Sequence, residues 1–111
     1  MVFKEKLNRQ EIRVLARKYK KAMEKAGYPV TKLILFGSYA RGSERDWSDV
    51  DFVVISPKYE QKDDFNEAVR ANVIAAQVSL AIEAHIATLA EFENCDSPWL
   101  AEAKKYGKEI I

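Results

Sequence analysis

The sequence predicts an α/β (α+β) fold, a small mixed β-sheet flanked by helices, in one domain over residues 1–111. Three observations lead to this prediction. Two apolar, β-branched segments in the first half have the length of buried strands, and amphipathic helices with recognisable caps lie before and after them. A chain of 111 residues buries roughly 65% of its unfolded surface on folding, which is enough for a single core.

The first expected element is an amphipathic helix over Asn8–Ala26. Apolar side chains recur there at three- and four-residue spacings, so they share one face of the helix. Asn8 and Glu11 resemble a capping box, and Gly27 followed by Pro29 ends the helix. The opposite face is rich in Lys and Arg. We expect it to face solvent, with contact to an acidic partner as the alternative.

Two strands and a short helical turn are expected next. Val30–Phe36 is rich in β-branched and apolar residues and runs directly into Gly37, so a buried strand ends there. Ser38 is the expected N-cap of a short helical turn that stops at Gly42. After a polar loop, Asp49–Ser56 is apolar on both faces except at its start, which is typical of a central strand.

The second half of the chain is expected to alternate helices with a third strand. A charged loop over Lys58–Asp63 leads into a helix that runs from the capping pair Asp64 and Glu67 to Ala76, and a strand over Val78–Ala87 follows. Thr88 and Glu91 then open a short helix, and a last helix runs from Ser97–Pro98 to Gly107. A short edge strand is expected at Ile110–Ile111. In the third strand, alternation puts Glu83 and His85 on one face.

Composition excludes several classes of function. The 18 Lys and Arg residues nearly balance 17 Asp and Glu residues, and the net charge of +1 argues against a dedicated binder of nucleic acids or membrane surfaces. The single cysteine, Cys95, cannot form an internal disulfide, which fits a reducing compartment. Met1–Lys6 lacks the apolar run of a signal peptide, and Ala71–Ile82, the longest charge-free stretch, is too short and too polar to span a bilayer. We therefore expect a cytoplasmic protein.

Two acidic residues at the start of the second strand carry the strongest chemical signal. Alternation places Asp49 and Asp51 on one face, with Cα atoms roughly 6.5 to 7 Å apart. Their repulsion at the end of an apolar strand is relieved by a hard cation such as Mg²⁺, which takes one or two carboxylates together with water and substrate phosphates. Gly37 lets the backbone approach an anion closely, and Ser38 adds a hydroxyl donor. The combination predicts metal-dependent phosphate chemistry.

The segments Leu35–Gly42 (LFGSYARG) and Ser48–Val54 (SDVDFVV) resemble the nucleotidyltransferase signature of the DNA polymerase β-like superfamily. Small single-domain members of that superfamily are called minimal nucleotidyltransferases. The resemblance implies transfer of a nucleoside monophosphate, with AMP from ATP as the expected case, to a hydroxyl acceptor. It also implies that Gly37 and Ser38 hold the nucleotide phosphates, and that Asp49 and Asp51 ligate two Mg²⁺ ions.

Three further residues are candidates for the same site. The superfamily uses a third carboxylate on a later strand, and Glu83 is the only acidic residue of the expected third strand, so it is the candidate metal ligand and general base. A solvated surface Glu83 is the alternative. His85 either orients a substrate or serves as a packing residue. Arg41 either binds the triphosphate or pairs with Glu44 or Asp46.

The resemblance also implies a partner. Minimal nucleotidyltransferases are typically paired with a helical HEPN protein, and in toxin-antitoxin pairs of this type the minimal enzyme is the antitoxin that transfers AMP to a tyrosine of the HEPN toxin. We expect this function, with a catalytically idle binding module as the first alternative. Transfer to a small molecule such as an antibiotic is a further alternative, which the short chain disfavours. Base preference and self-association remain open at this point.

Overall fold

A four-stranded mixed sheet forms the centre of the molecule, in the strand order β3 (Ile82–Ala87), β2 (Val50–Ile55), β1 (Lys32–Phe36) and β4 (Lys108–Glu109). The computed structural model describes residues 6–46, 48–60 and 64–111. Strand β1 is antiparallel to both β2 and β4, whereas β2 and β3 are parallel. The predicted α/β class with a mixed sheet is confirmed.

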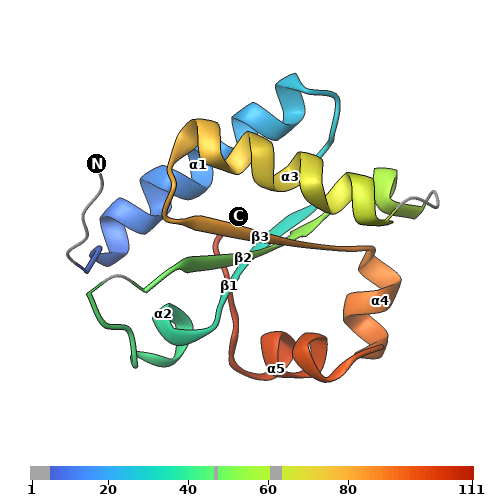
Figure 1. The fold of residues 1–111 in the computed structure, drawn as a ribbon. Coiled ribbons are helices and arrows are strands. Elements are labelled where there is room, and N and C mark those ends of the chain that lie inside the picture. Colours follow the sequence, from blue (N-terminus) through green and yellow to red (C-terminus); the bar gives the residue numbers. More distant parts are fainter. Residues whose placement is uncertain (1–5, 47, 61–63) are drawn as a thin grey trace.

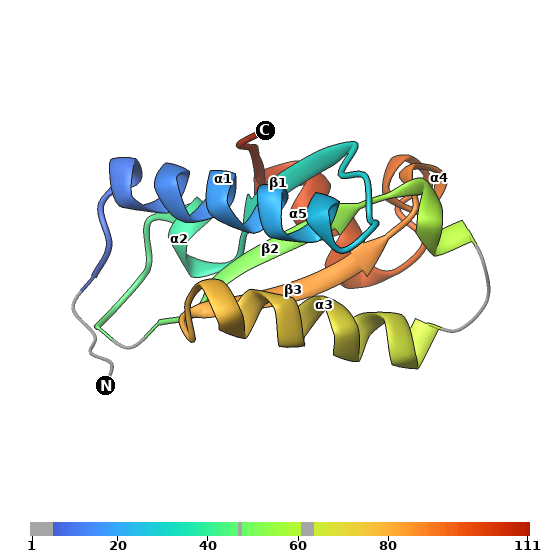
Figure 2. The same ribbon diagram turned by 90° about the horizontal axis from the view of Figure 1, so that it is seen from above.

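Helices cover both faces of this sheet (Figure 1). On one face lie the two long helices, α1 (Arg9–Lys25) and α3 (Asp64–Val78), which run side by side across the strands in both views (Figures 1 and 2). The short helices α2 (Ser38–Arg41), α4 (Leu89–Asn94) and α5 (Pro98–Tyr106) lie on the opposite side. Among the described residues, no helix combines the length and the apolar character needed to cross a membrane.

Reciprocal hydrogen bonds at two helix starts confirm the predicted capping boxes. The Asn8 side chain accepts a hydrogen bond from the Glu11 N–H at 2.8 Å, and the Glu11 carboxylate accepts one from the Asn8 N–H at 2.8 Å. Thr88 and Glu91 form the same arrangement before α4, at 3.0 and 2.8 Å. These pairs satisfy amides that a helix leaves unbonded at its first turn.

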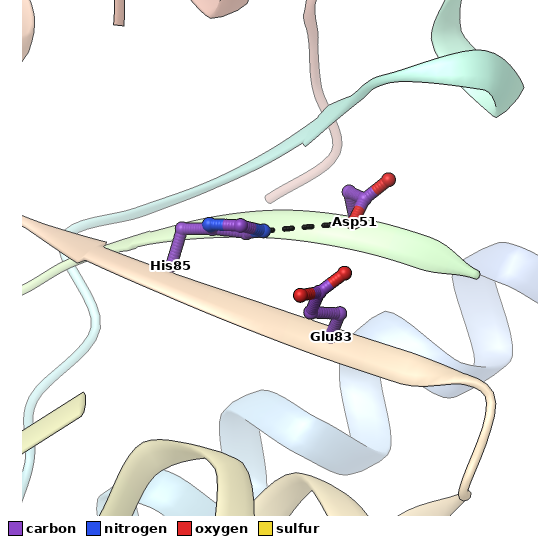
Figure 3. A group of neighbouring side chains, drawn as sticks. All are labelled: Asp51, Glu83 and His85. Atoms are coloured by element: carbon purple, nitrogen blue, oxygen red, sulfur yellow. Dashed lines mark ion pairs between the residues drawn. The ribbon is translucent and has the colours of Figure 1, made fainter. Parts of the chain in front are cut away.

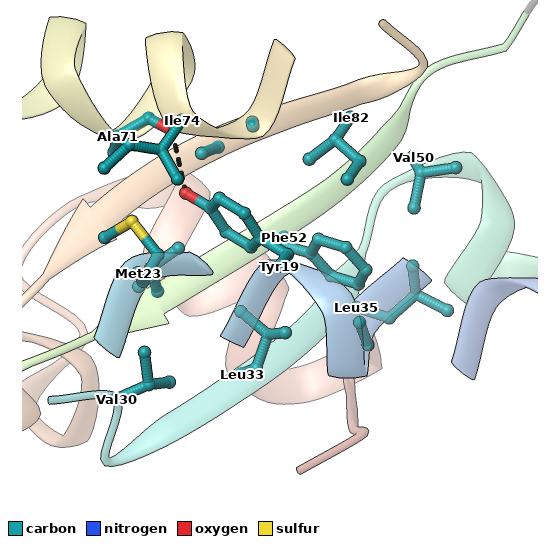
Figure 4. Packing of buried hydrophobic residues seen from close by; sticks show 14 of the residues in the cluster. Tyr19, Met23, Val30, Leu33, Leu35, Val50, Phe52, Ala71, Ile74 and Ile82 are labelled. Atoms are coloured by element: carbon teal, nitrogen blue, oxygen red, sulfur yellow. Dashed lines mark hydrogen bonds between the residues drawn. The ribbon is translucent and has the colours of Figure 1, made fainter. Parts of the chain in front are cut away.

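The core has two layers, one on each side of the sheet. Between the sheet and the two long helices, Tyr19 stacks on Phe52 with ring centroids 6.2 Å apart, and both side chains are fully buried (Figure 4). The Tyr19 hydroxyl donates to the carbonyl of Ala71 on α3 at 2.9 Å. On the other side, Val53 and Ile55 and their neighbours pack against α5. Because both faces of β2 are buried, it is the central strand that the sequence predicts.

Several predicted boundaries are wrong. Gly37, not Ser38, is the N-cap of α2, because its positive φ of 76° turns the chain from strand to helix within one residue. Asp64 is the first residue of α3 rather than its cap. Strand β3 begins at Ile82 instead of Val78, because α3 continues through Val78 and a turn follows, with the Ser79 N–H bonded to the Ala75 carbonyl at 2.8 Å.

Two more corrections concern the loop after β2 and the C-terminal end. The expected charged loop, Lys58–Asp63, overlaps the 3-10 helix η1 (Pro57–Glu60) in its first half. The rest of that loop, like most of Met1–Lys6, lies outside the described residues. The edge strand is Lys108–Glu109 rather than Ile110–Ile111. The two isoleucines still continue alongside β1, since the Ile110 N–H donates to the Leu33 carbonyl at 2.9 Å.

Candidate active site

Three side chains with metal-ligand chemistry meet on the sheet face that carries the short helices. The parallel register of β2 and β3 pairs Asp51 with Glu83, and Val53 with His85. One ligand atom from each of Asp51, Glu83 and His85 lies within 4.8 Å of the others (Figure 3). The sequence places Glu83 and His85 on one face, and the register brings that face next to Asp51.

Asp49 stands apart from this cluster. It lies directly before β2 and is exposed, and the group of three ligand-type side chains found within the described ranges does not include it. Its charge nevertheless acts on Glu83 and raises the pKa of that carboxyl. Asp49 therefore lies within electrostatic reach of the cluster, at the edge where the strand begins.

The carboxyl of Glu83 has a pKa above its ordinary value. The largest cause is a hydrogen bond with the Asp51 side chain, followed by partial desolvation. The negative charges of Asp51 and Asp49 act in the same direction, while His85 lowers the pKa of Glu83. The two carboxyls therefore repel each other when both are charged, and a divalent cation would relieve this repulsion.

His85 packs against aromatic rings, as one of its two expected roles requires, and it also faces Asp51. Its Nε2 atom lies 3.5 Å from Oδ1 of Asp51. The ring also packs edge-on against Phe36, with centroids 4.9 Å apart, and lies at 5.4 Å from the ring of Trp99. The Nε2 atom is buried and has no hydrogen-bond partner within the part of the chain that is described. The ring is therefore held by aromatic contacts while its nitrogen faces the carboxylates.

The turn between β1 and α2 lies directly beside Asp51. Phe36 pairs with Asp51 across the β1–β2 ladder, so Gly37 is the next residue beyond the pair. A Cβ atom added to Gly37 would lie 2.5 Å from Oδ2 of Asp51, and φ at Gly37 is +76°. Space and backbone conformation both require glycine here. Ser38, half-buried, is the first residue of α2.

Arg41 has a partner that sequence reasoning missed. Its guanidinium nitrogen lies 3.0 Å from a carboxylate oxygen of Glu102 on α5, rather than pairing with Glu44 or Asp46. Both side chains are about half exposed, at 46% and 41%. The pair joins α2 to α5 across the side of the sheet that carries the cluster, and no local pattern in the sequence signals it.

Asn72 is a second residue that sequence reasoning did not single out. Its side-chain amide donates to the Ala84 carbonyl at 2.9 Å, and its carbonyl oxygen accepts from the Ala84 N–H at 2.9 Å. Ala84 lies between Glu83 and His85, so this pair of hydrogen bonds fixes the outer edge of β3 at the cluster. The available signal was an amide within the otherwise apolar stripe of α3.

A cavity of about 420 Å³ opens beside the cluster. His85 and Trp99 line one part of it, and the acidic residues Asp64, Glu91 and Asp96 line another. Of the three cluster residues, His85 lines this cavity, whereas Asp51 and Glu83 do not.

The donor set fits a divalent cation. Carboxylate oxygens are the ligands that Mg²⁺ and Mn²⁺ prefer, and imidazole nitrogen is a common ligand of first-row transition ions. The raised pKa of Glu83 and the unpartnered Nε2 of His85 are both features that a bound cation would resolve. A mixed sheet that carries such acids beside a strand-Gly-Ser-helix junction defines a class, the enzymes that transfer nucleotidyl groups.

Comparison with known proteins agrees with this class. The model of the family described as "Nucleotidyltransferase domain" matches residues 16–109, and the chain belongs to this family. Two proteins of Methanocaldococcus jannaschii are similar to it. One, named "Putative protein adenylyltransferase MJ1215", is 46% identical over 44 residues, which are 40% of this chain and 50% of that protein. The other, "Putative protein adenylyltransferase MJ1379", is 48% identical over 44 residues, 40% of this chain and 43% of its own length. The matched segment thus spans about half the length of these relatives.

Two solved structures share the fold. A toxin-antitoxin crystallised with AMP-PNP superposes with a TM-score of 0.58 at 20% identity, covering 86% of this chain and 71% of the other. A mutant of the toxin-antitoxin MntA-HpeT superposes with a TM-score of 0.56 at 18% identity, covering 95% of this chain and 73% of the other. At these identities the likeness establishes the nucleotidyltransferase fold.

Proposed function

We propose that the chain transfers AMP from ATP to a hydroxyl group of a partner protein. The observation that carries this proposal is the meeting of Asp51 and Glu83 beside the Gly37 turn. Membership of the nucleotidyltransferase family supports the reaction type. The names of the two archaeal relatives support a protein acceptor, and the structural relative crystallised with AMP-PNP supports an adenine nucleotide.

Each residue of the proposed site has a defined role. Asp51, Glu83 and Asp49 hold Mg²⁺, with two ions as the proposed complement. When bound, such ions offset the charge of the triphosphate and lower the pKa of an attacking hydroxyl. Gly37 and Ser38 hold the nucleotide phosphates: Gly37 allows the chain to turn into α2 directly beside Asp51, and Ser38 offers its hydroxyl as a donor. Arg41 contacts the triphosphate once it leaves Glu102.

The proposed reaction is an in-line displacement at the α-phosphorus. The acceptor oxygen forms a bond to the α-phosphorus. At the same time the α-phosphorus loses its bond to the oxygen that bridges it to the β-phosphorus, and pyrophosphate leaves. Glu83 takes the proton of the acceptor hydroxyl. Glu83 suits this role by position, because its side chain lies next to Asp51 at the place where the acceptor hydroxyl would meet the metal.

We propose a tyrosine of a HEPN-family toxin as the acceptor, and hence the role of antitoxin for this chain. Both structural relatives are toxin-antitoxin proteins, which supports a toxin partner. The cavity beside His85 and Trp99 is consistent with a protein acceptor, because it gives an entering side chain a place against the ring of His85, whose Nε2 atom lies 3.5 Å from Oδ1 of Asp51.

An exposed apolar face on α3 favours a second candidate, a binding module that neutralises its partner by contact alone. On α3, Phe65 and Val73 are 78% and 53% exposed, and Val69 lies between them. Leu80, in the turn that follows the helix, is 72% exposed. Contiguous exposed apolar side chains often mark protein interfaces. Such a surface would work without a nucleotide, so the two candidates differ in whether catalysis is needed.

One experiment separates them. The chain is incubated with Mg²⁺, a HEPN-family protein encoded beside it, and ATP, GTP, CTP or UTP labelled at the α-phosphate. We expect label on a tyrosine of the partner with ATP, lost when the metal is chelated. A stable complex that neutralises the toxin without any label would support the binding module instead, and label on neither protein in any arm would overturn the proposed activity.

A further inference from the structure

His85 brings a nitrogen donor to a site otherwise made of carboxylates. Its Nε2 atom is buried, lies 3.5 Å from Oδ1 of Asp51 and has no hydrogen-bond partner within the described residues. An ordinary N–H···O hydrogen bond is about 2.9 Å long, so the pair is too far apart for a good one. A buried polar atom without a partner is unusual, and a bound ion is one explanation for it.

The distance suits two ligands of one ion. Donor atoms about 2.1 Å from a shared ion stand about 3.0 Å apart at a right angle and about 3.4 Å apart at the tetrahedral angle. The observed 3.5 Å between His85 and Asp51 is close to the second value. Glu83 offers a third donor within the same 4.8 Å group.

The aromatic contacts explain why the ring keeps this direction. Phe36 meets the imidazole edge-on at 4.9 Å, and Trp99 lies at 5.4 Å on α5. With two sides occupied, the ring is held with Nε2 toward Asp51, as Figure 3 shows. A histidine that served packing alone would not need its nitrogen to face the acids.

We propose that His85 ligates the cation held by Asp51 and Glu83 and thereby shifts the preference of the site from Mg²⁺ toward Mn²⁺, Co²⁺ and Zn²⁺. Magnesium favours oxygen donors, whereas imidazole strengthens binding of the first-row transition ions. This inference rests on the metal site of the proposed function. It adds which divalent ions that site binds with the highest affinity.

The chain offers a clean spectroscopic test, because His85 is its only histidine. In an untagged protein loaded with Mn²⁺, imidazole nitrogen coupling in pulsed electron paramagnetic resonance can arise from His85 alone. We expect this coupling in the wild-type protein and its loss in H85Q. Absence of the coupling in the wild-type protein overturns the proposal, and this result needs no variant to fold.

Affinities give the second readout. We expect H85Q to lose about 10-fold or more in Co²⁺ affinity while its Mg²⁺ affinity changes by less than about 3-fold, both measured by calorimetry. H85F keeps an aromatic ring against Phe36 and Trp99 and should lose Co²⁺ affinity to the same extent. Equal Co²⁺ affinity in all three proteins contradicts a ligand role. Nitrogen coupling without any nucleotidyl transfer would leave this inference standing and overturn the proposed function. Nucleotidyl transfer without nitrogen coupling would overturn this inference and leave the proposed function standing.

Discussion

Gly37 is packed against the carboxylate of Asp51, so that a Cβ atom at position 37 would lie 2.5 Å from Oδ2 and 3.3 Å from Cγ of that side chain. Contacts below 3.0 Å force one group to move, and Asp51 belongs to the proposed metal cluster. The glycine of the strand-to-helix turn therefore does two things. It allows the positive φ, and it leaves Asp51 room to face Glu83.

Gly37→Ala should impair both the site and the fold. Gly42 is the control for a positive φ, because its φ of +75° nearly equals the +76° of Gly37 while a Cβ there meets nothing within 4 Å. G42A, in the left-handed helical region with ψ of 18°, should lower the free energy of unfolding by about 1 to 2 kcal/mol. G37A should lower it further, because ψ of −152° places Gly37 in a region that essentially only glycine adopts. Only G37A should also lose metal binding, measured by calorimetry. Equal metal affinity in the two variants would contradict the close packing on Asp51.

Asn72→Ala should destabilise the edge of β3. The variant removes both hydrogen bonds to Ala84, so we expect a loss of about 1 to 3 kcal/mol in the free energy of unfolding. The Ala84 amide should also exchange its hydrogen faster. Gln77→Ala, at an exposed position of the same helix, is the control and should change stability by less than about 0.5 kcal/mol. Unchanged exchange at Ala84 in N72A would show that the amide is not held by Asn72.

These contacts also show where sequence reasoning succeeds and where it ends. Capping boxes act within four residues, so Asn8–Glu11 and Thr88–Glu91 can be read directly from the chain. Alternation puts Glu83 and His85 on one face, because side chains in strands have a period of two. The start of β3 differs from the prediction because the apolar residues from Val78 onward suit the end of a helix as well as a strand.

Contacts between distant segments carry no such local signal. Arg41 finds Glu102, and Asn72 finds Ala84, only because the topology brings their elements together. The same holds for His85, whose neighbours Phe36 and Trp99 come from β1 and α5. Sequence motifs thus pointed to the residues of the candidate site, while the contacts of each residue required the fold.

Two buried tyrosines should respond differently to removal of the hydroxyl. Tyr19 donates to the Ala71 carbonyl, whereas the Tyr59 hydroxyl has no hydrogen-bond partner among the residues described. Y19F should lose about 1 kcal/mol or more of unfolding free energy, and Y59F should lose none or gain up to about 1 kcal/mol. Chemical denaturation at pH 7 checks both values. A larger loss in Y59F than in Y19F would contradict the described bonding.

The same tyrosines make stability depend on alkaline pH. Burial raises the pKa of Tyr19, and the nearby Tyr59 raises it further. Burial is also the largest cause of the raised pKa of Tyr59, and Tyr28 and Glu67 act in the same direction. Unfolded tyrosines ionise near pH 10, so above that pH the folded state binds more protons and stability falls. Below pH 10 neither group has an effect. Each Phe variant should make the fall of the unfolding free energy with pH above pH 10 less steep, by up to about 1.4 kcal/mol per pH unit. An unaltered slope in both variants would show that other groups cause the fall.

Arg41 and Glu102 should contribute little to stability and differ in their effect on nucleotide affinity. The pair is half exposed, so breaking it with E102Q should change the free energy of unfolding by about 0 to 1 kcal/mol. R41Q should raise the KM for ATP by about 10-fold, because a charged hydrogen bond to phosphate is lost. Arg17→Gln, exposed on α1, is the control. An unchanged KM in R41Q would leave Arg41 with Glu102 as its only role.

The most direct test of the account is the single-turnover rate of AMP transfer to the HEPN partner in D51N and E83Q, with E93Q as the control. Glu93 is exposed on α4, outside the carboxylate cluster, so its variant should transfer at the wild-type rate. We predict that D51N and E83Q remain folded by circular dichroism and lose at least about 100-fold in rate, as expected for loss of a metal ligand or general base. Transfer at the wild-type rate by D51N would show that the Asp51–Glu83 cluster is not the catalytic site.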